Sequence, residues 1–310
     1  MQIIDPKVEI IKERNPFKKI EIASRTCYKS ESSITDDSAM AFYDRLVKSQ
    51  HTAMLEHATF VFEANEYVYR AAKECKYLNC TKTICVNASS GLSETRYIVS
   101  GNLRAINESG IDALIGCLFY EGSGNGKLAY TTFSQNEYAH AVSEDLATHL
   151  INFEDIINPH PEEIKAHKYT TMRFTTDRGV SHELCRHRLF SFAQESTRYV
   201  TYTKDQFGGG NIKFIKPTGF DDWSMDMRQH LEVALREAEK CYNRLIANGA
   251  KAQQARAVLP NAVKTEIVVT GNDAEWQHFF NLRSKGTTGA PHPDMKVVAD
   301  MALELYNKNI

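Results

Sequence analysis

The sequence predicts an α+β fold in which a mixed β-sheet is flanked by helices. Three segments have the apolar, β-branched character of strands, at residues 58–63, 168–176 and 265–270. Other segments carry apolar residues at helical spacing, most clearly 224–247. The chain has 310 residues, of which 42% are hydrophobic. It can therefore bury a sizeable core as one unit that carries an insertion.

The first half of the chain contains one clear helix and one clear strand. Residues 38–49 have apolar side chains at helical spacing, and Thr35-Asp-Asp precedes them as a helix N-cap. The strand at 58–63 follows. Further along, we expect helical pieces at 68–77 and 111–120.

The second half begins with the strand at 168–176, which Asp177-Arg-Gly ends. Ser181 then caps a predicted helix that runs through residues 186–188. The other predicted elements of this half follow in order: helix 224–247, a shorter helix ended by Pro260, strand 265–270, a helix capped by Asn272 and Asp273 that runs through Phe280, and a last helix at about 294–308.

Charge and composition exclude several classes of protein. The formal net charge of -2 gives no global attraction to nucleic acid. No run approaches the ~18 apolar residues that a membrane span requires. The N-terminus lacks the basic start and apolar stretch of a signal peptide, so we expect a cytoplasmic protein. The seven cysteines match no common zinc pattern, and we expect reduced thiols and no metal.

The segment Arg186-His187-Arg188 is followed, after seven residues, by Ser196-Thr-Arg198. Guanidinium groups make planar, bidentate contacts with phosphate, and an imidazole can donate or accept a proton. This chemistry suits an anionic ligand with several phosphates. A basic run is more often a solvated face, but apolar residues interrupt this one. From residue chemistry alone, an anion site and a structural role remain equally open.

Arg-His-Arg, seven residues and then Ser is the pattern of the flavin-dependent thymidylate synthases, and the chain resembles that family. Three further blocks are similar to the family: Ser24–Tyr28, His51–Phe60, and the region from Ala255–Pro260 to Asn281–Arg283. The resemblance covers most of the chain outside 65–165. Since Ser100–Ala105 is similar to longer members, we expect one catalytic domain over 1–310 with an insertion at about 110–165.

The resemblance implies an activity and its cofactors. Members of this family methylate dUMP reductively to dTMP and use no protein nucleophile. The carbon comes from 5,10-methylenetetrahydrofolate, and the hydride comes from FAD that NADPH has reduced. The family also implies a homotetramer whose active sites lie at subunit interfaces, with small-molecule substrates and neither nucleic acid nor membrane as a partner.

Roles for individual residues follow from the same resemblance. FAD is expected at His57, Thr59, Arg186, His187, Arg188, Gln194, Asn272, His278 and His292. The dUMP molecule is expected at Glu183, Arg186, Gln194, Glu195, Ser196, Thr197, Arg198, Arg256 and Arg283. Arg256 would reach the dUMP phosphate from a neighbouring subunit. Arg283 would be the catalytic residue, because it stabilises negative charge on the uracil ring.

Two other classes of protein compete with this interpretation. Ser181-His182-Glu183 resembles the start of a zinc-binding H-E-x-x-H motif, but His187 comes one residue too late for one helical face. The arginines could instead belong to a nucleotide- or RNA-binding protein, although no aromatic-basic array accompanies them. Cys185 could be a nucleophile, but we interpret it as a partly buried helix thiol.

Overall fold

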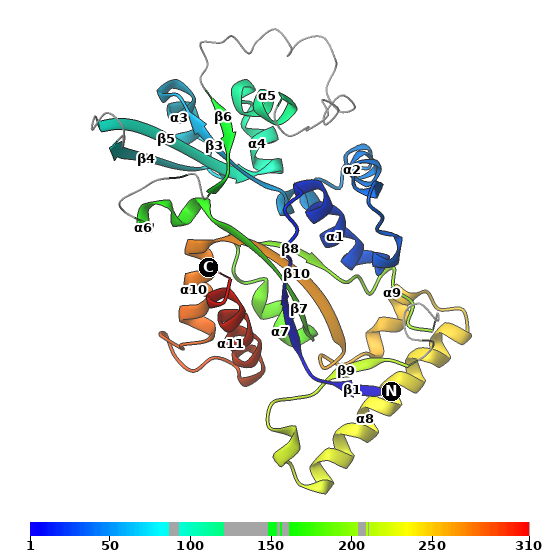
Figure 1. Ribbon diagram of the computed structural model, residues 1–310. Helices are drawn as coiled ribbons and strands as arrows, with labels where there is room; N and C mark the ends of the chain where they lie inside the picture. The colour runs from blue at the N-terminus through cyan, green and yellow to red at the C-terminus, as the bar shows by residue number, and fades with distance from the viewer. Residues whose placement is uncertain are drawn as a thin grey trace.

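The computed structural model describes residues 1–86, 93–120, 148–153, 156, 161–203, 209 and 211–309. Within these ranges, helices surround two four-stranded sheets and one two-stranded sheet (Figure 1). The predicted α+β class is confirmed. The strands are divided among three sheets, however, and both four-stranded sheets are antiparallel. None of the helices in the described ranges has the length and apolar character needed to cross a bilayer.

The central sheet has the strand order β2-β7-β10-β8. Its strands are β2 Lys7–Ile10, β7 Tyr169–Asp177, β10 Lys264–Asn272 and β8 Ser191–Gln194. The interior strand β10 pairs with β7 along its whole length and with β8 on its other side. Its middle, Ile267-Val-Val269, is fully buried, as its β-branched composition favours.

The two faces of the central sheet are covered by different helices (Figure 1). On one face, Ile267 and Val269 join a core with Trp276, Phe279 and Phe280. The helices of this face are α7 Arg178–Leu184, α10 Asp273–Arg283 and α11 Pro293–Asn307. On the other face, Val268 packs with Ala23 and Ala193 beneath α1 Pro16–Tyr28. The 3-10 helices η1 Glu31–Ser33 and η2 Thr52–His57 follow α1 along the chain.

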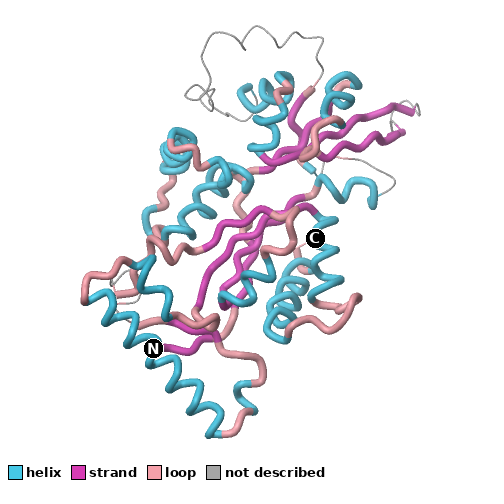
Figure 2. Tube along the Cα trace, turned by 180° about the vertical axis from the view of Figure 1, so that it is seen from behind, coloured by secondary structure: helices cyan, strands magenta, loops and turns pink. Residues whose placement is uncertain are grey.

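A second sheet with the order β4-β5-β3-β6 forms a separate lobe (Figure 2). Its strands are β4 Asn79–Val86, β5 Ser93–Asn102, β3 Thr59–Ala64 and β6 His149–Ile151. The helices of this part of the chain are α2 Ser38–Lys48, α3 Glu66–Lys73, α4 Leu103–Ser109, α5 Asp112–Tyr120, α6 Pro161–Ile164 and η4 Lys165–His167. Buried residues from α1 to α5 form one continuous core with this sheet.

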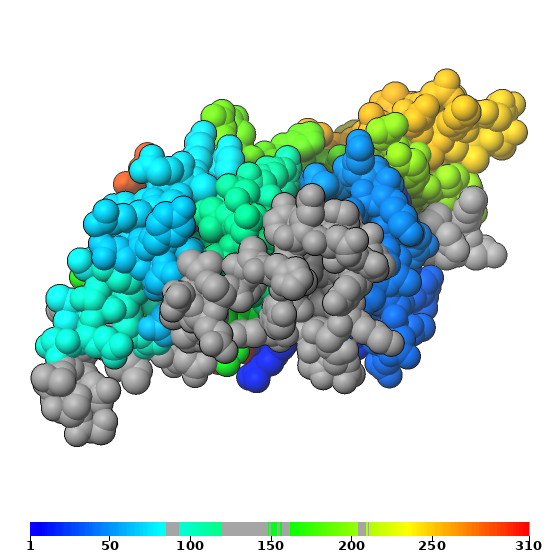
Figure 3. Space-filling view, turned by 90° about the horizontal axis from the view of Figure 1, so that it is seen from above, coloured from blue at the N-terminus to red at the C-terminus, as the bar shows by residue number. Residues whose placement is uncertain are grey.

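The third part of the chain is built on a parallel pair of short strands, β1 Gln2–Ile4 and β9 Lys213–Ile215. The long helix α8 Met225–Ala247 packs here through Leu235 and Tyr242. The short helices η6 Phe220–Asp222, α9 Ala252–Ala255 and η7 Arg256–Val258 complete it. Seen from above, α8 and the second sheet lie at opposite ends of the molecule (Figure 3).

Most of the predicted helices and strands are present, but two predictions are wrong. The helix predicted to start at Ser181 starts instead at Arg178, because Asp177 accepts a hydrogen bond from the Val180 amide (2.8 Å). It ends at Leu184, so residues 186–188 lie in turns before β8. The region after 65 also contains β4 and β5, which the helical expectation missed. Much of the predicted insertion, residues 121–147, lies outside the described ranges.

Gly271 on β10 provides a test of the packing on the α10 face. A Cβ at this position would lie 2.2 Å from Cδ1 and 2.3 Å from Cε1 of the buried Phe190 ring. We expect Gly271→Ala to lower the free energy of unfolding by about 1–3 kcal/mol, because the ring has to move. Denaturant unfolding measures this. In the double variant with Phe190→Leu the cost should be smaller than the sum of the single costs, and strictly additive costs would contradict the steric account.

Candidate functional site

The Arg-His-Arg segment lies in the turns that connect α7 to β8. Backbone hydrogen bonds from the Arg186 amide to Glu183 and from the His187 amide to Leu184 tighten the chain directly after the helix. Arg186 and Arg188 are consequently exposed, whereas His187 turns inward and keeps 9% of its surface. Its ring packs edge-on against Phe279, with a centroid distance of 5.1 Å. The segment thus presents two cations outward and an imidazole inward.

Arg283 joins this imidazole to a carboxylate. Its Nε donates to Nε2 of His187 at 3.1 Å, and its Nη1 donates to Oε2 of Glu183 at 3.0 Å. Arg283 is the last residue of α10, a helix that Asn272 begins by accepting a hydrogen bond from the Glu275 amide (3.0 Å). Because residues 183, 187 and 283 come from α7, the turn and α10, three elements must pack correctly to form this cluster.

His187 is neutral in this arrangement. Burial, helped by the nearby Arg283 guanidinium and by His278, lowers the pKa of His187 to about 4. The exposed His278 lies close by, with its ring centroid 6.1 Å from that of His187. Since the arginine can only donate, Nε2 of His187 must be the unprotonated nitrogen. The predicted flavin positions 187 and 278 are therefore brought together.

The end of β8 and the segment after it hold the predicted dUMP residues 194–198. Gln194 Nε2 donates to Ser181 Oγ (2.7 Å) and to Thr265 Oγ1 (3.2 Å). Beyond it, Arg256 Nη1 donates to Thr197 Oγ1 at 3.1 Å within the same chain. Arg198 is exposed, and its guanidinium lies 5.5 Å from the Tyr199 ring centroid.

Within the same segment, Ser196 Oγ accepts a hydrogen bond from the Arg198 amide at 3.2 Å. Glu195, in contrast, is buried and forms an ion pair with Lys264 (2.9 Å). The segment therefore exposes the guanidinium of Arg198 on its outer side while it anchors the carboxylate of Glu195 in the interior.

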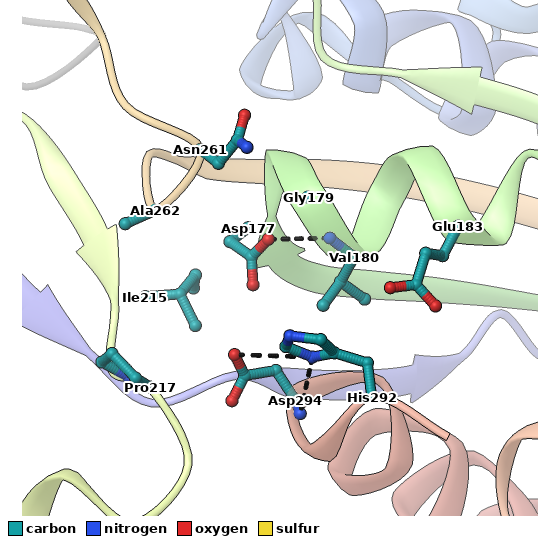
Figure 4. Close-up of a pocket in the computed structure, with 10 residues that line it drawn as sticks. All are labelled: Asp177, Gly179, Val180, Glu183, Ile215, Pro217, Asn261, Ala262, His292 and Asp294. Carbon is teal, nitrogen blue, oxygen red and sulfur yellow. Dashed lines mark hydrogen bonds and ion pairs between the residues drawn. The ribbon is translucent and has the colours of Figure 1, made fainter. Parts of the chain in front are cut away.

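A cavity of about 260 Å³ opens beside the Glu183 carboxylate (Figure 4). His292, at the start of α11, lines it together with Asp294 and Asp177. His292 Nδ1 accepts a hydrogen bond from the Asp294 amide at 3.3 Å. Burial raises the pKa of Asp177, although the hydrogen bond from the Val180 amide opposes this. Because carboxylates line the cavity, a phosphate group would be disfavoured in it and a neutral polar ring would suit it better.

His57 and Thr59 are not part of the Arg283 cluster in this chain. His57 is fully buried, and its Nδ1 lies 2.8 Å from Oγ1 of Thr270, which in turn contacts Thr171 (2.9 Å). Burial lowers the pKa of His57 to about 4. Thr59 begins β3 and pairs with Asn102. In the isolated chain His57 therefore has the environment of a buried, neutral histidine.

Several residues that position the site were not found from the sequence. Arg178 Nη1 donates to the Glu195 carbonyl (3.2 Å) and to Thr265 Oγ1 (3.3 Å), and Lys264 binds the Glu195 carboxylate. The sequence feature that could have indicated them is the pair of charged residues in Lys264-Thr-Glu266, at the beginning of an otherwise apolar strand. Across the described ranges, no three His, Cys, Asp or Glu side chains gather in a way that could hold a metal ion.

A known protein family matches most of the chain. The sequence profile of the family described as thymidylate synthase complementing protein matches residues 9–73 and 126–310. A flavin-dependent thymidylate synthase of Geobacter sulfurreducens is 42% identical over 106 residues, which cover 34% of this chain and 43% of that protein. One of Mycobacterium tuberculosis is 38% identical over 135 residues, which cover 39% of this chain and 49% of that protein. The chain thus spans less than half the length of these relatives.

Among solved structures, a UMP/dUMP methylase from Streptomyces cacaoi, bound with 5-Br dUMP, aligns over 99% of this chain and 93% of its own. The sequence identity is 14% and the TM-score is 0.42.

The His187–Arg283 contact can be tested through the titration of the imidazole. Replacing Arg283 with Met removes the guanidinium that opposes protonation, so we expect the pKa of His187 to rise from about 4 towards 6.5. It should remain below 6.5 because burial, the larger cause, persists. NMR titration of the histidine ring protons measures this. Arg236→Met, on the exposed face of α8, is the control. An unchanged pKa of His187 in a folded Arg283→Met protein would contradict the contact.

Proposed function

Because the chain belongs to the thymidylate synthase complementing protein family, we propose that it methylates dUMP reductively to dTMP. The observation that carries the proposal is the placement of Arg283. Its guanidinium is held between His187 and Glu183, the residue of this cluster that lines the cavity, and 23% of the Arg283 side chain is exposed. A fixed cation at this place suits a ring on which negative charge develops during the reaction.

The dUMP molecule would bind along the segment from Gln194 to Arg198. The exposed guanidiniums of Arg198 and Arg256 flank Thr197 and suit the phosphate, which prefers planar, bidentate donors. The uracil ring would point towards Glu183 and Arg283, where the cavity provides space. Gln194, which Ser181 and Thr265 hold in place, would lie between these two ends.

FAD would bind at Arg186, His187 and Arg188, with Asn272, His278, His292 and, across a subunit boundary, His57 and Thr59 around the flavin. One observation supports the fit. Arg186 and Arg188 are exposed, and neither has an ion-pair partner within the described ranges. They are therefore available to a diphosphate. When bound, FAD supplies the hydride, NADPH would be its reductant, and 5,10-methylenetetrahydrofolate would supply the carbon.

The residues of this chain would then act by orientation and electrostatics. Arg283 would stabilise the negative charge that develops on the uracil ring. Glu183 fixes the direction of the guanidinium through Nη1, and His187 fixes it through Nε. The preorganised cation would favour the charged transition state without reorganisation during the reaction. No side chain would form a covalent bond with the nucleotide.

We also propose a homotetramer with active sites at the subunit interfaces, and one catalytic domain over 1–310 with an insertion at about 110–165. His57 and Thr59 lie outside the Arg283 cluster of their own chain, so a flavin that contacts both sets of residues would need a second chain. Arg256 already reaches Thr197 of its own chain (3.1 Å). Its contribution to dUMP binding in a neighbouring subunit stays a prediction.

Substitution of Arg283 tests the proposed chemistry. Arg283→Ala should lower the rate of dTMP formation by about two to three orders of magnitude, because one charge-stabilising donor is lost. The flavin spectrum should persist, since the phosphate-binding arginines remain. Turnover of purified protein with dUMP, NADPH and methylenetetrahydrofolate is the measurement, and Arg236→Ala on α8 is the matched control. Turnover close to that of the unaltered protein would disprove the role of Arg283.

Cys185 tests the absence of a protein nucleophile. The expectation of a thiol within a helix is wrong, because Cys185 lies just after α7 as its C-cap, and the residue as a whole is exposed. Partial burial of the sulfur nevertheless raises the pKa of the thiol, so it is protonated at neutral pH. Cys185→Ala should keep most of the turnover and change stability by no more than about 0.5 kcal/mol, as should the control Cys241→Ala. Loss of turnover together with a dUMP adduct on Cys185, detected by mass spectrometry, would refute the mechanism.

A further inference from the structure

A chain of four alternating charges, of which Glu195 is buried and the other three are half-buried, runs behind the segment that we propose to bind dUMP. Lys29 Nζ lies 2.6 Å from Oε2 of Glu266, whose Oε1 lies 2.6 Å from Nζ of Lys264. The same Lys264 ammonium lies 2.9 Å from Oε2 of Glu195. The side chains are only 18%, 16%, 11% and 2% exposed, in the order Lys29, Glu266, Lys264, Glu195. We refer to these residues as the charge chain.

The charge chain connects three separate elements. Lys29 is the residue that ends α1, in the left-handed backbone conformation (φ 51°), and Lys264 and Glu266 begin β10. Glu195 follows β8. Backbone hydrogen bonds connect the same elements: the Glu195 amide donates to the Glu266 carbonyl (2.8 Å), and the Ser196 amide donates to the Cys27 carbonyl (2.9 Å). The peptide between Glu195 and Ser196 is thus fixed by β10 on one side and by α1 on the other.

The two central groups, Glu266 and Lys264, remain charged. Burial alone would raise the pKa of Glu266, but Lys264 and Lys29 lower it to about 2. For Lys264, burial lowers the pKa, and the two carboxylates more than compensate. Burying such charges gains little net stability, because desolvation offsets the attraction, and apolar residues of similar size often stabilise a protein equally well. A gain in net stability therefore does not explain why these charges are present. The explanation that we favour is that they fix the position of the segment from Glu195 to Arg198.

We propose that Lys264 is a positioning residue for the nucleotide. By holding the Glu195 carboxylate in the interior, it keeps Ser196, Thr197 and Arg198 turned towards the ligand. This inference rests on the proposed function, since it assumes that the segment binds dUMP. Lys264 has no described contact with Glu183, His187 or Arg283. Its loss should therefore weaken binding of dUMP and leave the chemical step almost unchanged.

Calorimetric titration of dUMP into the flavin-loaded protein tests the inference. Lys264→Met should raise the dissociation constant for dUMP, and the KM, about tenfold or more, with kcat and the flavin spectrum retained. Lys264→Arg can keep both ion pairs and should restore most of the affinity. Lys240→Met, which breaks an exposed pair with Glu237 on α8, should leave the affinity unchanged. Unaltered dUMP affinity in Lys264→Met would overturn the positioning role alone.

A double variant distinguishes two roles of Lys264: positioning of the segment that binds dUMP, and neutralisation of the Glu195 charge. Lys264→Met leaves the Glu195 carboxylate buried without its partner, which lowers stability. Adding Glu195→Gln removes that charge, so the double variant should regain thermal stability and still bind dUMP weakly. If it regained full dUMP affinity, Lys264 would serve only to neutralise Glu195, and the proposal would be wrong. If the unaltered protein bound no dUMP, the proposed function would fail and this inference would fail with it.

Discussion

The register of β10 between β7 and β8 is the constraint on which the site depends. Even-numbered residues of this strand face α1 and η2, where Glu266 meets Lys29 and Lys264, and Thr270 meets His57. Odd-numbered residues face α7 and α10, where Thr265 meets Gln194. A slip of one residue would exchange the two sets. The apolar residues Ile267 and Val269, buried against the aromatic core, make that exchange costly, so the core fixes the positions of the polar side chains.

The same strand separates two electrostatic environments. Behind the segment 194–198, opposite charges are paired in the interior and have little freedom to move. In front of it, the guanidiniums of Arg186, Arg188 and Arg198 are exposed. Cations that lack a paired carboxylate attract anionic ligands more strongly than cations already neutralised. The proposed phosphate contacts would therefore lie on the outer side, and the acidic cavity beside Glu183 would suit a less charged ring.

The sequence predicted those helices and strands whose caps and apolar spacing can be recognised within a few neighbouring residues. Ser224 before α8 and Asn272 before α10 are N-caps, and the apolar spacing of both helices is visible in the sequence. The motif residues were found through family resemblance, but their neighbours were not. Lys264 and Glu195 are 69 positions apart, and only strand pairing brings them together. The helix predicted through Arg186–Arg188 was wrong, because Asp177 caps a helix that starts at Arg178, three residues before Ser181, and ends at Leu184.

The contacts of Arg283 define what the cluster can do. A guanidinium has five N–H groups, and here one binds His187 and another binds Glu183. The remaining three have no partner within the described ranges and can bind a ligand in the same plane. Because Nε2 of His187 accepts from Arg283, the proton of this neutral imidazole lies on Nδ1, and any hydrogen bond that His187 donates must come from there. The cluster thus orients the cation with one acceptor for Nε and one for Nη1, and a ligand that accepts hydrogen bonds from the other N–H groups would lie in the plane that these two contacts fix.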